Sequence, residues 1–118
     1  MINNTEPFYI YRAKVTEVYD GDTVTVDIDL GFSVILRKQK IRLCGINAPE
    51  VKGESRELGL VTRDWLREHI LGKDIILHTI RDRSEKYGRY LGIIYLPEIG
   101  TNINEELLQL GLAIPYIE

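Results

Sequence analysis

The chain lacks the features that mark several classes of protein. Cys44 is its one cysteine, so an intrachain disulfide and a metal site built on cysteines are both excluded. No stretch approaches the run of about 18 apolar residues that a membrane-spanning helix needs. Positive charge is not in excess, because 15 Lys and Arg stand against 18 Asp and Glu and give a net charge of −3. We therefore expect any contact with nucleic acid to be local.

The composition is that of a folded, soluble protein. The 118 residues are 44% hydrophobic and 28% charged, which predicts one packed domain and excludes a disordered or collagenous chain. We expect this domain to span residues 8–118, after a flexible N-terminal segment of residues 1–7. The chain as it stands carries no export signal. We expect a monomer that does not bind membranes, cytoplasmic as read, or secreted if a signal peptide has been removed from a longer precursor.

Apolar residues at every second position predict most of the strands. The first strand begins near Phe8 and ends at Asp20-Gly21, a strong signal for a hairpin turn. The second runs to Leu30, with apolar side chains at even positions and Thr or Asp between them. Asp22 has the parity of the apolar set, so we predict that its carboxylate points inward at the end of this strand. Three further strands are expected at residues 34–43, 74–80 and 91–96.

Two helices complete the predicted pattern. The first follows Pro49 and ends near Gly72, and the second begins at Asn102 as its N-cap and ends near Gly111. Spacing of three and four residues predicts the apolar faces. In the first helix the face is Leu58, Val61 and Trp65 with Leu66 or His69, and in the second it is Ile103, Leu107 and Leu110. Three strands, a helix, two strands and a helix match a mainly β fold with α elements, the five-stranded Greek-key barrel called the OB-fold. An SH3-like barrel would usually lack the first helix.

Three short segments collect polar residues that a packed core does not need: Asp20 to Thr23, Arg42 to Glu50, and Lys86 to Arg89. Each segment alone is consistent with ordinary turn chemistry. Together they combine oxygen donors with fixed positive charge, which turn chemistry does not require. We therefore take them as candidates for one site.

The residue types in these segments suit phosphodiester hydrolysis. Asp22, Glu50 and the side-chain carbonyl of Asn47 are hard oxygen donors of the kind that hold Ca²⁺. Arg42 and Arg89 carry planar guanidinium groups that fit phosphate oxygens two at a time. On one face of a barrel, the metal and the arginines would stabilise the charge that develops on the phosphate, and Glu50 would deprotonate the attacking water.

Other metal sites and nucleophiles have less support. An EF-hand loop would need a ligand at Val24 and a glycine at Thr25. His69 and His78 lack the partners that a zinc site requires, so we expect both to be structural. The serines stand in no nucleophile-elbow motif.

Positive charge is concentrated in one stretch of the sequence. From Phe32 to Arg42 there are four basic residues and no acidic one, whereas no Lys or Arg follows Tyr90. The four are Arg37, Lys38, Lys40 and Arg42. This polarised charge favours a basic approach to a phosphate site, and the alternative is a solvated face of an edge strand.

The three segments, in this order, resemble the signature blocks of the staphylococcal nuclease-like (thermonuclease) domain family. The blocks are Val18 to Val24, Arg42 to Glu50, and Lys86 to Arg89. The later residues Asn104-Glu105, with Leu107, Gly111, Leu112 and Ala113, are similar to the late helix of that family. The resemblance extends from about Tyr11 to Tyr116. It implies an OB-fold barrel and a Ca²⁺-dependent nuclease that cleaves DNA and RNA with little sequence preference and leaves 3′-phosphate ends.

The resemblance also implies a role for each matching residue. Asp22 matches a calcium-ligating aspartate, Ala48 the residue that offers its backbone carbonyl, and Glu50 the general base. Arg42 and Arg89 match the arginines that bind the phosphate in the transition state. The remaining matches are Lys86, Tyr87 and Tyr116 around the bound nucleotide, and Asp20 as an acidic neighbour of the metal site.

Asn47 departs from the family pattern, because the best-known member has a second ligating aspartate at this position. An amide still offers an oxygen to Ca²⁺ but removes one negative charge, so we expect weaker metal affinity. The departure keeps a second hypothesis open, namely a catalytically silent OB-fold module that binds nucleic acid or a protein partner. The presence of Asp22, Arg42, Glu50 and Arg89 favours the enzyme.

Overall fold

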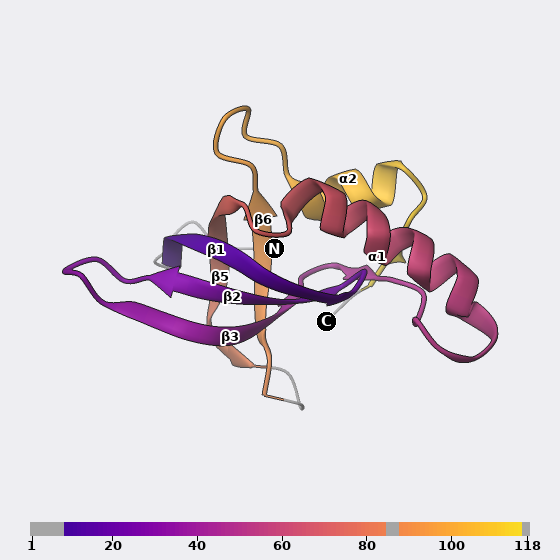
Figure 1. Cartoon of the computed structure of the whole chain (residues 1–118), viewed down its shortest axis with the longest axis horizontal. Coiled ribbons are helices and arrows are strands. Elements are labelled where there is room, and N and C mark those ends of the chain that lie inside the picture. The colour runs from indigo at the N-terminus through magenta and orange to yellow at the C-terminus, as the bar shows by residue number, and fades with distance from the viewer. Residues whose placement is uncertain (1–8, 85–87, 117–118) are drawn as a thin grey trace.

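The computed structural model describes residues 9–84 and 88–116. Its elements are β1 (Tyr9–Asp20), β2 (Thr23–Asp29), β3 (Ile35–Leu43), β4 (Ile46–Asn47), the 3₁₀ turn η1 (Gly53–Ser55), α1 (Arg56–Ile70), β5 (Asp74–Ser84), β6 (Tyr90–Tyr95), α2 (Ile103–Gln109) and β7 (Ile114–Pro115) (Figure 1). The predicted flexible segment of residues 1–7 lies outside the described residues, as do Lys86 and Tyr87.

Five strands close into a barrel in the order β1-β2-β3-β6-β5. All neighbouring pairs are antiparallel except β3 and β6, which run parallel. The helix α1 stands between the third and fourth barrel strands, and α2 follows the fifth. The predicted five-stranded barrel of the OB-fold type is therefore confirmed. The short pair of β4 and β7 was not predicted, because two residues per strand are too few to produce an alternating pattern.

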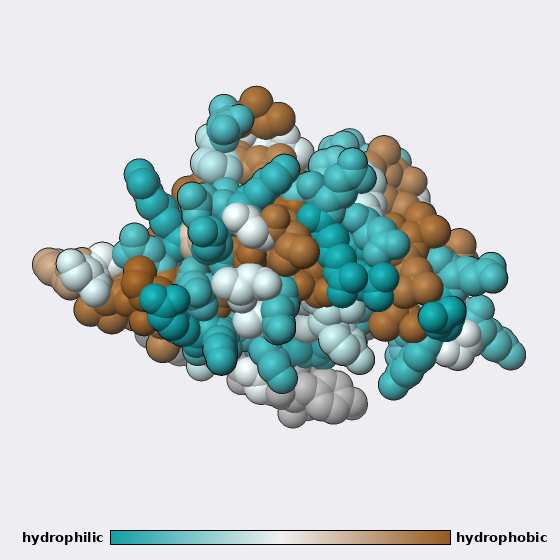
Figure 2. Space-filling view, in the orientation of Figure 1, coloured by the Kyte–Doolittle hydropathy of each residue, from teal (hydrophilic) through white to brown (hydrophobic). Residues whose placement is uncertain are grey.

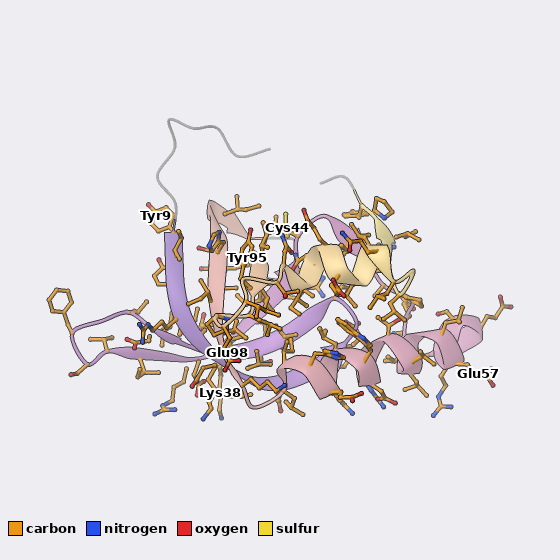
Figure 3. All side chains as sticks on the ribbon, turned by 90° about the horizontal axis from the view of Figure 1, so that it is seen from above. Tyr9, Lys38, Cys44, Glu57, Tyr95 and Glu98 are labelled. Atoms are coloured by element: carbon orange, nitrogen blue, oxygen red, sulfur yellow. The ribbon has the colours of Figure 1, made fainter. Side chains whose placement is uncertain are left out.

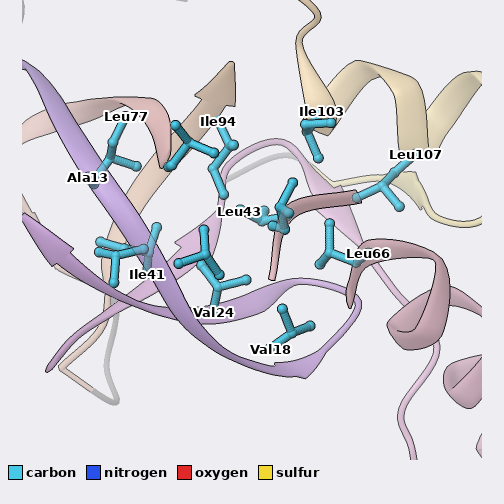
Figure 4. Packing of buried hydrophobic residues seen from close by; sticks show 14 of the residues in the cluster. Ala13, Val18, Val24, Ile41, Leu43, Leu66, Leu77, Ile94, Ile103 and Leu107 are labelled. Carbon is cyan, nitrogen blue, oxygen red and sulfur yellow. The ribbon is translucent and has the colours of Figure 1, made fainter. Parts of the chain in front are cut away.

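Apolar side chains from both helices and the barrel strands form the core (Figure 4). The even-numbered residues Val24, Val26 and Ile28 of β2 are buried, as the alternation predicts. From α1, Leu66 and Ile70 are fully buried, and from α2, Ile103 and Leu107. The core thus closes the end of the barrel that α1 and α2 cover.

The predicted apolar face of α1 is wrong in its first half. Leu58 and Val61 are 67% and 57% exposed, whereas Gly59 and Thr62 are buried. The reason is close approach, because a Cβ on Gly59 would lie 2.2 Å from the backbone oxygen of Glu50. Small residues therefore form the contact face where α1 meets the chain after β4, and hydrophobicity alone cannot predict such a face.

Leu110 is also exposed, contrary to the prediction for the second helix. The helix α2 ends at Gln109, and Leu110 is the residue that follows it. Leu110 is 52% exposed as a whole residue. The predicted N-cap is confirmed, because the side chain of Asn102 accepts a hydrogen bond from the backbone N–H of Glu105 at 3.1 Å.

The hairpin of β2 and β3 projects from the barrel, away from the N-terminal end of α1 that Glu57 marks (Figures 1 and 3). It carries a run of exposed apolar residues, and Phe32 is fully exposed. Figure 2 shows brown apolar surface at this end of the molecule, whereas teal polar residues cover most of the barrel. No helix in the described residues is both long enough and apolar enough to cross a membrane.

Candidate active site

A cavity of about 600 Å³ opens beside the turn between β1 and β2. It collects side chains from the first two candidate segments and Arg89 from the third. The charged residues in its lining are four acids (Glu17, Asp20, Asp22 and Glu50) and four bases (Lys40, Arg42, Lys52 and Arg89). The lining therefore contains as many acidic as basic side chains, and the chemistry of the cavity depends on how these side chains are arranged.

Asp22 joins two of the candidate segments. The side chain of Asp20 turns the chain here, since its Oδ1 accepts a hydrogen bond from the backbone N–H of Asp22 at 3.0 Å. Asp22 is 8% exposed, and its Oδ2 accepts a hydrogen bond from the backbone N–H of Ala48 at 2.9 Å. The buried, inward-pointing carboxylate that parity predicted is thus fixed to the loop that carries Asn47 and Glu50.

Gly21 makes this junction possible. A Cβ at Gly21 would lie 2.7 Å from the Cβ of Ala48 and 2.4 Å from a methyl group of Thr62. Real side chains do not approach this closely, so the turn, the loop at Ala48 and helix α1 meet only because residue 21 has no side chain. The same Thr62 donates a hydrogen bond from its hydroxyl to the carbonyl of Leu112 at 2.7 Å.

Arg42 is held in place by backbone carbonyls. Its Nη1 donates hydrogen bonds to the oxygens of Leu43 and Ile46, at 3.3 and 3.2 Å, and lies 3.7 Å from Oδ2 of Asp22. Its Nη2 lies 3.5 Å from the side-chain oxygen of Asn47. The side chain is only 11% exposed, so its position is determined before any ligand binds.

Thr23 connects the second arginine to the same carboxylate. Nη1 of Arg89 donates a hydrogen bond to Oγ1 of Thr23 at 2.8 Å, and that hydroxyl donates to Oδ1 of Asp22 at 3.2 Å. Arg42 and Arg89 therefore lie on two sides of Asp22. Sequence reasoning gave Thr23 no role, although it belongs to the Asp-Gly-Asp-Thr motif and pairs with Arg42 across β2 and β3.

Glu50 lines the same cavity from the loop before α1. Its side chain is exposed, and its backbone oxygen accepts a hydrogen bond from the hydroxyl of Ser55 at 3.0 Å. Because Gly59 packs closely against this oxygen, the loop lies at a fixed, short distance from α1. A solvated carboxylate on a fixed backbone, at the edge of a cavity that contains two arginines, is well placed to accept a proton.

Two carboxylates lie close together at the turn. Burial, together with the negative charge of Asp22, raises the pKa of Asp20 to about 6. Burial first, and then repulsion from Asp22, therefore disfavours the charged form of Asp20, and a bound cation would offset both effects. The donor set is therefore suited to a hard cation such as Ca²⁺, which prefers oxygen ligands.

Within the described residues, no three acidic, histidine or cysteine side chains converge on one point as a complete metal site. A cation at the turn would need other oxygens besides the carboxylates. Asn47 is exposed beside Arg42, and Ala48 follows it in the chain. Their amide and backbone oxygens are donors of the type that Ca²⁺ accepts.

Of the other residues considered in the sequence analysis, some line the cavity and others lie outside it. Tyr116 packs against Arg42, with the guanidinium carbon 5.2 Å from the ring centre. In the basic stretch, Lys40 and Arg42 line the cavity, but Arg37 forms an ion pair with Asp27 at 3.1 Å. Neither His69 nor His78 belongs to the cavity: the ring of His69 stacks on Trp65, and that of His78 contacts Tyr95.

The sequence of the chain is similar to a known protein family and to several known proteins. Residues 40–118 match the family model described as staphylococcal nuclease homologue. The chain is 31% identical over 103 residues to a thermonuclease of Staphylococcus hyicus, and the matched region covers 85% of this chain and 56% of that protein. It is 28% identical over 115 residues to a micrococcal nuclease of Shigella flexneri, with 90% and 59% covered. An uncharacterized protein of Methanocaldococcus jannaschii is 29% identical over 130 residues, with 91% and 60% covered. The chain thus spans somewhat more than half the length of these relatives.

Proposed function

The chain belongs to the staphylococcal nuclease family, and from this premise we propose that it is a Ca²⁺-dependent phosphodiesterase that hydrolyses DNA and RNA with little sequence preference. The observation that carries the proposal is the single cavity in which the acids Asp20, Asp22 and Glu50 lie with Arg42 and Arg89. These five residues come from three distant parts of the chain. A barrel without a ligand would have no need to bring them together.

The two arginines bind the scissile phosphate. Each presents several N–H donors, and the hydrogen bonds to backbone carbonyls and to Thr23 fix where they point. Groups fixed in advance stabilise the charge of the transition state without reorganising during the reaction. The loose approach of Arg42 to Asp22, 3.7 Å, leaves donors of its guanidinium available to a phosphate oxygen.

Glu50 acts as the general base. Its carboxylate accepts a proton from a water molecule, whose oxygen forms a bond to phosphorus while the bond from phosphorus to the 5′-oxygen breaks. The 5′-oxygen leaves and takes up a proton from solvent, and the phosphate stays on the 3′ side. This assignment of ends rests on the family resemblance. No side chain forms a covalent bond to the substrate in this scheme.

Ca²⁺ is the proposed cofactor, held by the carboxylate of Asp22, the amide oxygen of Asn47 and the backbone carbonyl of Ala48, with Asp20 as an acidic neighbour. When bound, the cation would polarise the phosphate and offset its developing negative charge. The residues fit this role because they are oxygen donors and because burial, together with the negative charge of Asp22, raises the pKa of Asp20 at the turn. By family resemblance, Lys86, Tyr87 and Tyr116 contact the nucleotide.

The test compares the wild type with Glu50→Gln on plasmid DNA and on RNA, in Ca²⁺, Mg²⁺ or EDTA. We expect cleavage only with Ca²⁺, and a loss of about two to four orders of magnitude in turnover for Glu50→Gln. Glu54→Gln, the same exchange at an exposed position outside the cavity, is the control and should cleave normally.

Equal cleavage by the wild type and Glu50→Gln would contradict the mechanism. Binding of a labelled strand with no cleavage under any condition would favour the silent binding module instead. Asn47 is the residue that gives this second function its support, because an amide there lowers the negative charge available to a metal.

A further inference from the structure

The cavity continues beyond the two arginines along the outer face of β1, β2 and β3. Strand register defines two parallel rows of side chains on this face. In the first row, Asp20 pairs with Thr23 and Thr23 with Arg42. In the second row, Glu17 pairs with Thr25 and Thr25 with Lys40. All six residues line the same cavity.

The second row lies too far from the first to serve the same phosphate. Lys40 is two residues from Arg42 on β3, which corresponds to about 7 Å along the strand. This separation is comparable to the distance between successive phosphates of a polynucleotide. A strand whose scissile phosphate lies between Arg42 and Arg89 would therefore place a neighbouring phosphate within reach of Lys40.

Lys40 is available for such a contact. It is exposed, and in the described part of the chain it forms no ion pair and no side-chain hydrogen bond. Arg37, three residues earlier on the same strand, has its charge offset by Asp27 at 3.1 Å. Arg37 and Lys40 thus differ. Among the four basic residues of β3, all of them in the described part of the chain, Lys40 alone lines the cavity and has no ion pair that offsets its charge.

Tyr19 supplies an aromatic ring on the same wall. It lies where the register of β1 and β2 shifts, between Val18 and Asp20, and it lines both this cavity and the neighbouring one beside Arg67. The residue is 64% exposed. Exposed aromatic rings beside positive charge are the platforms on which proteins stack the bases of single strands.

We propose that Lys40 and Tyr19 form a second subsite, which binds the nucleotide adjacent to the one under attack. Lys40 contacts the neighbouring phosphate, and Tyr19 stacks on the unpaired base. The ligand class is a single-stranded polynucleotide. Glu17, in the same row, weakens the subsite by its negative charge. The proposal deepens the proposed function and rests on it for the position of the scissile phosphate.

Binding is measured by fluorescence anisotropy with a labelled short oligothymidylate, in Ca²⁺, in the Glu50→Gln background. Lys40→Gln should raise Kd about three- to tenfold and reduce the slope of log K against log salt by about 0.7, the loss of one phosphate contact to a single strand. Arg37→Gln removes the same charge from the same strand outside the cavity, and it should leave both quantities unchanged. Glu17→Gln should lower Kd about twofold.

The tyrosine is tested by a pair of substitutions. Tyr19→Ala should raise Kd about fivefold or more, whereas Tyr19→Phe, which keeps the ring, should bind as the parent does. Equal Kd values for Lys40→Gln and Arg37→Gln would overturn the phosphate contact, and equal losses for Tyr19→Ala and Tyr19→Phe would overturn stacking. These outcomes are separate from the proposed function, which fails if the wild type cleaves nothing, whatever the binding data show.

Discussion

The hydroxyl of Thr23 has the central position among the charged side chains of the site. It accepts a hydrogen bond from Arg89 and donates one to Asp22, so a neutral side chain sets the distance between the proposed phosphate-binding group and the proposed metal ligand. At the scale of single residues, the site therefore depends on neutral groups as much as on charged ones. Gly21, Thr23 and the backbone N–H of Ala48 each position a residue to which we assign a catalytic or binding role.

We predict that Thr23→Val lowers turnover about tenfold, because a hydrogen bond to a charged group contributes about 1.5 kcal/mol. Valine suits a strand, so the barrel should remain folded. Steady-state kinetics on RNA give the measurement. Thr23→Ser keeps the hydroxyl and should restore most of the turnover. A serine variant as slow as the valine variant would show that shape, and not the hydrogen bond, accounts for the effect.

The second prediction at this scale concerns Asn47. Asn47→Asp adds a negative charge beside Asp22 and should tighten Ca²⁺ binding roughly tenfold, since ligand charge is a main determinant of affinity in oxygen-ligand sites. Isothermal titration calorimetry measures it directly. Gln109→Glu, which adds the same charge at an exposed position at the end of α2, is the control. An unchanged affinity for Asn47→Asp would remove Asn47 from the proposed ligand set.

At the scale of elements, α1 positions the loop that carries Glu50. The helix meets this loop through Gly59 and meets β1 through Arg67, whose guanidinium donates two hydrogen bonds to the carbonyl of Val18, at 3.0 and 3.2 Å. The same helix thus contacts the chain on both sides of the cavity. We therefore expect the distance between α1 and the barrel to influence how far Glu50 lies from the two arginines.

Gly59→Ala tests this dependence. Alanine improves helix propensity by about 1 kcal/mol, but its Cβ would collide with the backbone oxygen of Glu50. Overpacking costs about 1 to 3 kcal/mol, so we predict a net loss of stability together with reduced turnover. Urea unfolding and RNA cleavage measure the two effects. Val61→Ala, on the exposed face of the same helix, should change stability by less than about 0.5 kcal/mol and leave turnover unchanged. A more stable, fully active Gly59→Ala would refute the steric argument.

The elements also show which features of the fold can be predicted from the sequence alone. The strands were predictable because alternation reflects burial on one face, and β2 buries its even-numbered residues as expected. The buried face of α1 could not be predicted in the same way. Gly59 and Thr62 are buried there because they are small, and not because they are hydrophobic. Candidate residues were found because three segments of the chain carry unusual polar residues. The contact of Thr23 with Arg89 and the row from Glu17 to Lys40 depend on register between distant strands, which a local pattern does not contain.

For the whole molecule, a net charge of −3 is compatible with nucleic-acid binding only if the contact is local. The cavity contains four cations, and four acids share its lining. Electrostatic attraction to a long polynucleotide should therefore be limited to a few phosphates. The arrangement differs from that of proteins that bind nucleic acid through a broad basic surface.

This arrangement predicts a shallow salt dependence. Each phosphate contact with a single strand contributes about 0.7 to the slope of log K against log salt, so even five contacts, the four cavity cations and Lys86, give a slope no steeper than about −3.5. Anisotropy titrations of Glu50→Gln over a range of salt concentrations measure this slope. Glu98→Gln, which reduces the net negative charge at an exposed position outside the cavity, should leave the slope unchanged, whereas Lys52→Gln should reduce it. A steeper slope, or equal effects of these two substitutions, would mean that the polynucleotide contacts a surface well beyond the cavity, and the local interface inferred from the charge would be wrong.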